Sequence, residues 1–132
     1  ALVLGAGGSA RAVVWALRSV GAEVKAWARS KGETLGVEVV EGPVEADLLV
    51  NCTPVGLHDP EATPIAPQGY GTVVDLVYRE GGTRLIREAE EAGARTVDGL
   101  EILVRQGAES FTRWTGREAP LDAMRRGARG VH

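Results

Sequence analysis

The sequence contains little cysteine and no long apolar run, and both absences narrow the class of protein. Cys52 is the only cysteine among the 132 residues, so an internal disulfide is excluded. A single cysteine favours a reducing, cytoplasmic environment over secretion. No apolar run approaches the roughly 20 residues that a membrane-spanning helix needs. We therefore expect a soluble protein that has no membrane partner.

An excess of basic charge is also absent, and histidine is scarce. Lys and Arg number 15 against 18 Asp and Glu, and the net charge of -3 argues against nucleic-acid binding. His58 and Asp59 form too small a cluster for a metal site. Because Cys52 has no histidine near it in sequence except His58, we predict a small buried residue rather than a reactive thiol.

What the sequence does contain is a regular alternation of apolar strands and amphipathic helices. A strand over 1–4 precedes a helix with Ala10, Val13, Val14 and Leu17 on one face, and Gly21 ends that helix. Further strands are predicted over 23–28, 37–40, 48–50, 72–77 and 95–97. Further helices are predicted over 83–92 and from 120 to about 127. An apolar stripe that starts at 100 and ends before 116 predicts another helix between them.

This alternation predicts an α/β fold of the Rossmann type, a three-layer αβα sandwich around a mainly parallel sheet. One domain covers the whole of 1–132. Four prolines between 52 and 70 indicate a long loop there, and the arginine-rich tail 125–129 is expected to fray in solvent.

A glycine-rich turn follows the first strand. Gly5, Gly7 and Ala10 fill the small positions of the G-x-G-x-x-G/A pattern, with a strand before them and a helix after them. Glycine allows the tight turn and a close approach of the backbone to a pyrophosphate, and the helix N-terminus favours an anion. The pattern predicts dinucleotide binding; the alternative is a tight turn without a ligand.

The end of the second strand indicates which dinucleotide is preferred. An Asp or Glu stands there in proteins that bind the free ribose 2′-hydroxyl of NAD. Here the chain has Arg29, Ser30 and Lys31 instead, which suit a 2′-phosphate and favour NADP. The alternative is an ordinary solvated loop.

Several spaced motifs resemble the shikimate dehydrogenase family. They lie at 5–12, 51–57, 75–78, 98–107 and 111–116, so that the resemblance covers about residues 1–116. It implies an oxidoreductase that uses NADPH to reduce 3-dehydroshikimate reversibly to shikimate, a step of aromatic amino-acid (chorismate) biosynthesis. The alternatives are a related quinate or tetrahydrofolate dehydrogenase domain, and a non-catalytic nucleotide-sensing domain.

The resemblance also implies roles for individual residues. The pyrophosphate would be held by Gly5, Ala6, Gly7, Gly8 and Ser9, and the 2′-phosphate by Arg29 and Ser30. Thr53, Leu76 and Gly99 would border the nicotinamide and its ribose, while Tyr78 and Gln106 would face the substrate. The family motif Asn-Arg-Thr reads Ala28-Arg29-Ser30 here, which weakens the argument for NADP. Without a ligand, Thr53 would be a turn former, Tyr78 a strand-end residue of the core and Gln106 an ordinary solvated residue.

None of the residues with an implied role is a catalytic residue. Reduction of a ketone needs a proton donor, and in the resembling family a Lys and Asp pair from a preceding substrate domain supplies it. Lys25 and Lys31 are the only lysines, and neither matches that pair. Because Ala1 opens inside a strand-like run, we expect that an N-terminal substrate domain is absent here. The chain is then expected to bind cofactor without turnover.

Overall fold

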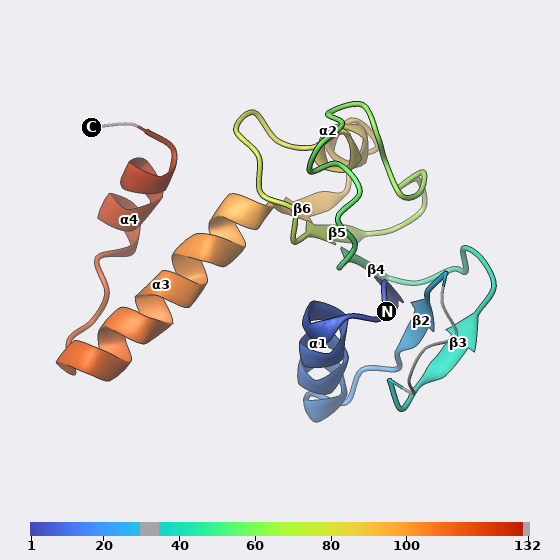
Figure 1. Ribbon diagram of the computed structural model, residues 1–132, viewed down its shortest axis with the longest axis horizontal. Helices are drawn as coiled ribbons and strands as arrows, with labels where there is room; N and C mark the ends of the chain where they lie inside the picture. Colours follow the sequence, from blue (N-terminus) through green and yellow to red (C-terminus); the bar gives the residue numbers. More distant parts are fainter. Residues whose placement is uncertain (30–34, 131–132) are drawn as a thin grey trace.

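The computed structural model describes residues 1–29 and 35–130, so Ser30 and Lys31 lie outside the described residues. The described strands are β1 (Leu2–Leu4), β2 (Lys25–Trp27), β3 (Glu38–Val40), β4 (Leu48–Asn51), β5 (Thr72–Asp75) and β6 (Arg95–Val97). The helices are α1 (Gly8–Ser19), α2 (Arg84–Glu91), α3 (Gly99–Thr115) and α4 (Leu121–Ala128) (Figure 1). All strand pairs are parallel, and the sheet order is β3-β2-β1-β4-β5-β6.

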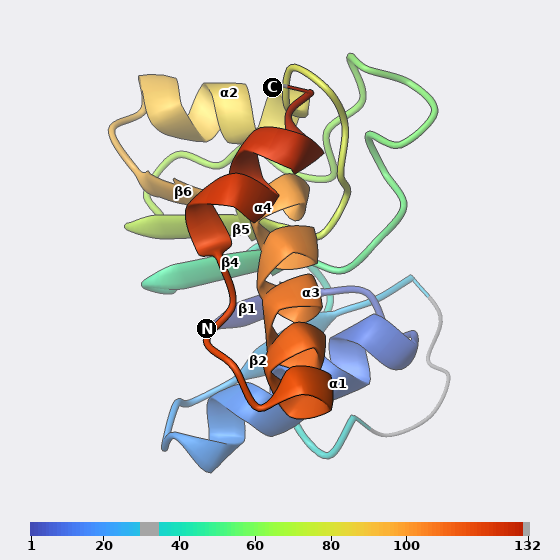
Figure 2. The same cartoon turned by 90° about the vertical axis from the view of Figure 1, so that its left-hand side faces the viewer.

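Helices cover both faces of this sheet. The connections β1-α1-β2 and β5-α2-β6 run in opposite directions from the sheet centre, and right-handed crossovers therefore place α1 and α2 on opposite faces. Figure 1 shows α3 on the same side as α1, and Figure 2 shows α4 lying alongside α3. This arrangement confirms the predicted three-layer Rossmann-type fold.

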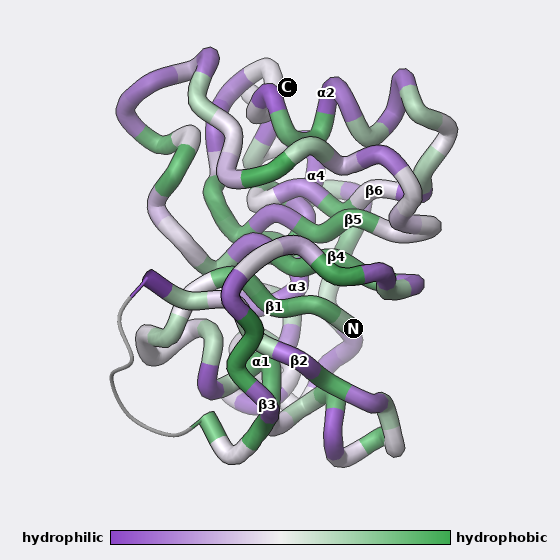
Figure 3. Tube along the Cα trace, turned by 90° about the vertical axis from the view of Figure 1, so that its right-hand side faces the viewer, coloured by the Kyte–Doolittle hydropathy of each residue, from purple (hydrophilic) through white to green (hydrophobic). Residues whose placement is uncertain are grey.

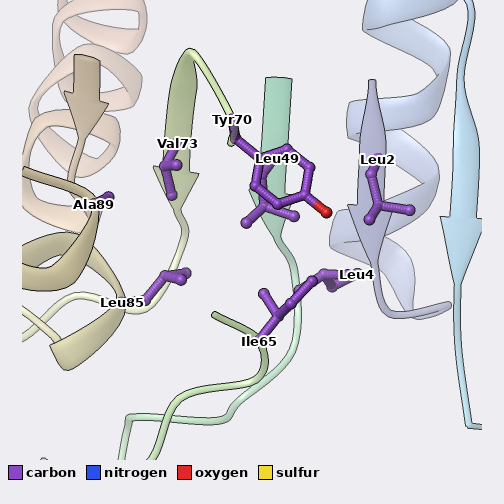
Figure 4. Close-up of a cluster of buried hydrophobic side chains, with 8 residues drawn as sticks. All are labelled: Leu2, Leu4, Leu49, Ile65, Tyr70, Val73, Leu85 and Ala89. Carbon is purple, nitrogen blue, oxygen red and sulfur yellow. The ribbon is translucent and has the colours of Figure 1, made fainter. Parts of the chain in front are cut away.

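The core consists of two apolar layers that are separated by the sheet. Leu2, Leu4 and Leu49 belong to the cluster on the α2 side, together with Leu85 of that helix (Figure 4). The α1 side contains Val3, Ala10, Val14, Val24, Ala26, Leu35 and Val50. The apolar colouring of β1 and β4 in Figure 3 is typical of strands that are buried on both faces.

Most of the predicted elements are present with small shifts at their ends. The strand predicted over 72–77 ends at Asp75, because the Val77 N–H turns back to the Asp75 side chain at 3.0 Å. Side-chain caps fix two helix starts: Thr83 accepts from the Ile86 N–H, and Asp98 accepts from the Glu101 N–H.

The prediction that the arginine-rich tail frays in solvent is wrong. Arg125 is ion-paired with Glu101 and Asp122, and Arg129 with Asp98 at 3.2 Å, so that α4 folds back along α3. The apolar stripe predicted for α3 is only partly buried. Val104 and Ala108 are covered, whereas two other members, Leu103 and Trp114, are 45% and 85% exposed.

Candidate functional site

The glycine-rich turn joins β1 to α1 at the carboxyl edge of the sheet. Gly5 has a φ of +107°, and a Cβ there would lie 3.2 Å from the Cys52 carbonyl oxygen, so the fold itself requires glycine. Gly7 and Gly8 differ, since a Cβ at either position would meet no described atom within 4 Å beyond its chain neighbours and the backbone of α1. The fold does not need glycine at these two positions, whereas a ligand that approaches the backbone closely would.

The start of α1 is open to an anion. Gly7 is its N-cap, and no side chain in the described part of the chain caps this end. Gly8 and Ser9 are exposed, so the first N–H groups of the helix face solvent. Helix N-termini of this kind bind phosphate groups, and the residues present therefore fit a pyrophosphate. Ala10 is fully buried, as expected for the third small position of the motif.

Arg29 lies at the same edge of the sheet as this turn. The Gly5 N–H donates to the Trp27 carbonyl at 2.9 Å, which places the end of β2 directly beside the turn. Arg29 follows two residues later and is exposed. A guanidinium at this place can pair with a phosphate on the adenosine ribose.

Asn51 fixes the loop that carries Thr53. Asn51 is fully buried at the end of β4, and its Oδ1 accepts from the Thr53 N–H at 3.0 Å and from the Thr53 hydroxyl at 2.6 Å. The Thr53 methyl would lie 3.4 Å from a Cβ on Gly5. Thr53 therefore borders the glycine-rich turn, as expected for a residue that shapes the same site.

Asp75 joins this network from the neighbouring strand. Its side chain is fully buried and accepts from Asn51 Nδ2 at 3.0 Å, the Val77 N–H at 3.0 Å and the Thr83 hydroxyl at 2.6 Å. Burial raises the pKa of this carboxyl group, and the three hydrogen bonds oppose that rise. Neither Asn51 nor Asp75 was predicted from the sequence as a site residue; the available signal was a polar residue at the end of two adjacent apolar strands.

Cys52 lies in the same region but is poorly suited to act as a nucleophile. Burial, with a smaller contribution from the charge of Asp75, raises the pKa of its thiol to about 12. The thiol therefore stays protonated near neutral pH. Among the described residues, no group of three or more His, Cys, Asp or Glu residues is arranged to bind a metal.

Gly99 brings α3 onto the backbone that follows β5. A Cβ on Gly99 would lie 2.4 Å from the Val77 carbonyl oxygen and 2.6 Å from Tyr78 Cα, so that no other residue fits this packing. Leu76 is half-buried and packs on the α1 side of the sheet. Gly99 and Leu76 thus lie next to the segment that carries Tyr78, at the carboxyl edge.

The two predicted substrate residues line different hollows. Tyr78 is 56% exposed and borders a hollow of about 470 Å³, together with Leu100 and the end of α4. Gln106 is exposed and borders a hollow of about 520 Å³ along α3, which Arg105 and Arg113 also line. It lies about 10 Å along the helix axis from Gly99. The structure therefore gathers the predicted cofactor residues that it describes at one edge and places Gln106 farther out.

Comparison with known proteins agrees with this geometry. The family model "Shikimate 5'-dehydrogenase C-terminal domain" matches residues 99–128. A shikimate dehydrogenase (NADP(+)) of Thermus thermophilus is 46% identical over 98% of this chain and 53% of its own length. One from Halobacterium salinarum is 39% identical over 95% of this chain and 53% of its own length. The chain spans about half the length of the curated relatives it matches.

Solved structures of shikimate dehydrogenases are also similar to this chain. A shikimate 5-dehydrogenase of Thermus thermophilus, in complex with NADP(H) and shikimate, superposes with a TM-score of 0.84 at 43% identity, over 98% of this chain and 54% of that one. The Aquifex aeolicus enzyme gives 0.83 at 39% identity, over 97% and 52%. None of the helices in the described part of the chain is long and apolar enough to cross a membrane. The chain therefore belongs to the shikimate dehydrogenase family, as the C-terminal domain of those enzymes.

Proposed function

We propose that this chain is the NADP(H)-binding domain of an enzyme that reversibly reduces 3-dehydroshikimate to shikimate. The observation that carries the proposal is the uncapped start of α1, together with Gly7 and Gly8, two glycines that the fold does not itself require. An approaching pyrophosphate explains both features. The relatives named as NADP(+)-dependent shikimate dehydrogenases support the choice of cofactor and reaction.

The cofactor fits along the carboxyl edge of the sheet. Residues 5–9 would hold the pyrophosphate at the start of α1, and Arg29 would pair with the 2′-phosphate. Ser30 and Lys31 belong to the same proposal on the basis of sequence alone. Thr53, Leu76 and Gly99 would border the nicotinamide, which supplies the hydride when the cofactor is bound.

We infer that the proton donor comes from another part of the enzyme. Lys25, one of the two lysines, lies within β2 and is ion-paired with Glu38 at 3.3 Å. Asp75 is buried and already accepts three hydrogen bonds, so it is not free to donate a proton to a substrate. We therefore infer a second, N-terminal domain that supplies the acid and most of the substrate site, with Tyr78 and Gln106 contributing from this side.

The exposed apolar side chains of α3 support a second domain. Leu103 and Trp114 of α3 are 45% and 85% exposed, although α3 also packs against α4. A second domain that packed along α3 would bury both side chains. The match to only about half of each relative leaves room for such a domain.

A direct test is to titrate this chain with NADPH and with NADH, and to assay it for shikimate oxidation. Trp27 lies two residues before Arg29 and serves as a fluorescence reporter. We expect NADPH to bind more tightly than NADH, and we expect no turnover. Equal affinity for the two cofactors would contradict the 2′-phosphate site, and turnover by the chain alone would contradict the need for a second domain.

A further inference from the structure

The carboxylate of Asp75 has a position that the proposed function does not use. Its side chain is fully buried where β5 ends, and it accepts three hydrogen bonds from three different segments. A buried carboxylate is unfavourable unless its lone pairs are used in this way. An apolar residue of similar volume would leave the Asn51 Nδ2 and Val77 N–H donors without an acceptor, so the carboxylate serves to organise these groups.

The three donors connect Asp75 to the nicotinamide end of the proposed cofactor site. Asn51 Nδ2 donates to Oδ1, and Asn51 in turn accepts from both the N–H and the hydroxyl of Thr53. The Val77 N–H donates to the same Oδ1 and fixes the backbone that leads into Tyr78 and lies against Gly99. The Thr83 hydroxyl donates to Oδ2 and anchors the carboxylate to the start of α2.

We propose that Asp75 is a positioning residue for the nicotinamide end of the cofactor site, an inference that rests on the proposed function. Its carboxylate holds the Thr53 loop through Asn51 and the Val77–Tyr78 backbone directly, so that the two walls keep a fixed separation. The glycine-rich turn at 5–9 makes none of these side-chain hydrogen bonds. Loss of Asp75 is therefore expected to weaken contacts at the nicotinamide end more than at the pyrophosphate end, although Thr53 also borders the turn at Gly5.

The test compares two ligands, NADPH and 2′-phospho-ADP-ribose, which lacks the nicotinamide. Their affinities are measured by calorimetry for the wild-type chain, Asp75→Ala and Asp75→Asn. Loss of the network is expected to weaken NADPH binding about tenfold in Asp75→Ala, the effect of roughly one hydrogen bond. In Asp75→Asn the loss is expected to be about threefold, because the amide oxygen still accepts from Asn51 and Val77. Binding of 2′-phospho-ADP-ribose is expected to stay within about twofold in both.

Tyr70→Phe is the matched control. It removes a hydrogen bond from the Tyr70 hydroxyl to the Val44 carbonyl at 2.9 Å, before the strands β4 and β5 begin and therefore at the opposite edge of the sheet. It is expected to lower the melting temperature without changing either affinity. A general loss of stability would instead affect both ligands alike in every variant.

Each remaining outcome separates the inference from the proposed function. If the wild-type chain binds neither ligand, the proposed function fails. If it binds both ligands and the Asp75 variants weaken both equally, or neither, the positioning role is overturned. If Asp75→Ala does not fold, Asp75→Asn decides alone, and an unchanged NADPH affinity in that variant overturns the inference.

Discussion

Arg125 of α4 donates two hydrogen bonds to the carboxylate of Glu101 in α3, from Nε to Oε2 at 3.0 Å and from Nη2 to Oε1 at 2.8 Å. Arg105 donates to the same carboxylate at 2.8 Å. These hydrogen bonds lower the pKa of Glu101 to about 2. The Glu101 carboxylate therefore links α4 to α3, and the fork geometry of the guanidinium makes this link directional.

This ion pair predicts a stability that depends on pH. Because the folded pKa of Glu101 lies below its unfolded value of about 4.3, its contribution is fully present above about pH 5 and is lost as the pH falls towards 2. We expect Glu101→Gln to melt several degrees below wild type at pH 7, with the difference shrinking between pH 4 and pH 2. Thermal melts monitored by circular dichroism would measure it.

Glu109→Gln provides the matched control for this prediction. Glu109 pairs with Arg113 on the same helix, but both side chains are largely exposed, at 70% and 75%. Exposed pairs contribute little to stability, so this variant should melt close to wild type at every pH. Equal pH dependence for wild type and Glu101→Gln would show that Glu101 does not stabilise the contact between α3 and α4.

Substitutions in the glycine-rich turn are expected to affect either the stability of the fold or the affinity for NADPH, depending on the position. Gly5→Ala introduces a Cβ at a positive φ and 3.2 Å from the Cys52 carbonyl, and it should destabilise the fold by about 1–3 kcal/mol. Gly7→Ala adds a Cβ in open space at a φ of -80°, so it should lower the melting temperature little while weakening NADPH binding about tenfold. Unchanged NADPH binding in Gly7→Ala would show that the cofactor does not lie against this turn.

The turn and the individual strands could be predicted because their signals are local. Gly5, Gly7 and Ala10 lie within one short motif, and the apolar strands are read from neighbouring residues. The link between Asn51 and Asp75 could not be predicted in this way, since the two residues are 24 positions apart and meet only when β4 pairs with β5. A pair of polar residues at the ends of apolar strands indicates a site but does not identify its partners.

For the arginine-rich tail, in contrast, the sequence led to a prediction that the structure contradicts. A run of arginines near a terminus is usually solvated, and its composition therefore predicts fraying. Here the turn after Gly116 reverses the chain, and α4 places Arg125 beside Glu101 and Arg129 beside Asp98. The sequence contains all four residues, but their pairing depends on a reversal that no local pattern encodes.

Arg29 predicts the cofactor preference. Arg29→Ala should weaken NADPH binding about tenfold or more and leave NADH binding nearly unchanged, because only NADPH carries the 2′-phosphate that a guanidinium would pair with. Arg95→Ala is the matched control, since Arg95 is also exposed but stands at the start of β6, on the opposite edge of the sheet. Calorimetric titration of both variants with both cofactors measures the preference. An equal loss for NADPH and NADH in Arg29→Ala would show that this side chain does not read the 2′-phosphate.

The Cys52 thiol is expected to resist alkylation in the folded protein. Burial and the nearby charge of Asp75 raise its pKa to about 12, so that almost no thiolate is present at pH 8. Iodoacetamide reacts with the thiolate, and the folded chain should therefore be modified at least about a hundredfold more slowly than the chain unfolded in guanidinium chloride, where the pKa returns to about 8.5.

Mass spectrometry of timed samples gives both rates. Because the chain has one cysteine, each modified molecule reports on Cys52 alone. Similar rates in the two states would mean that the end of β4 opens readily, and a fixed wall beside Thr53 would then be untenable.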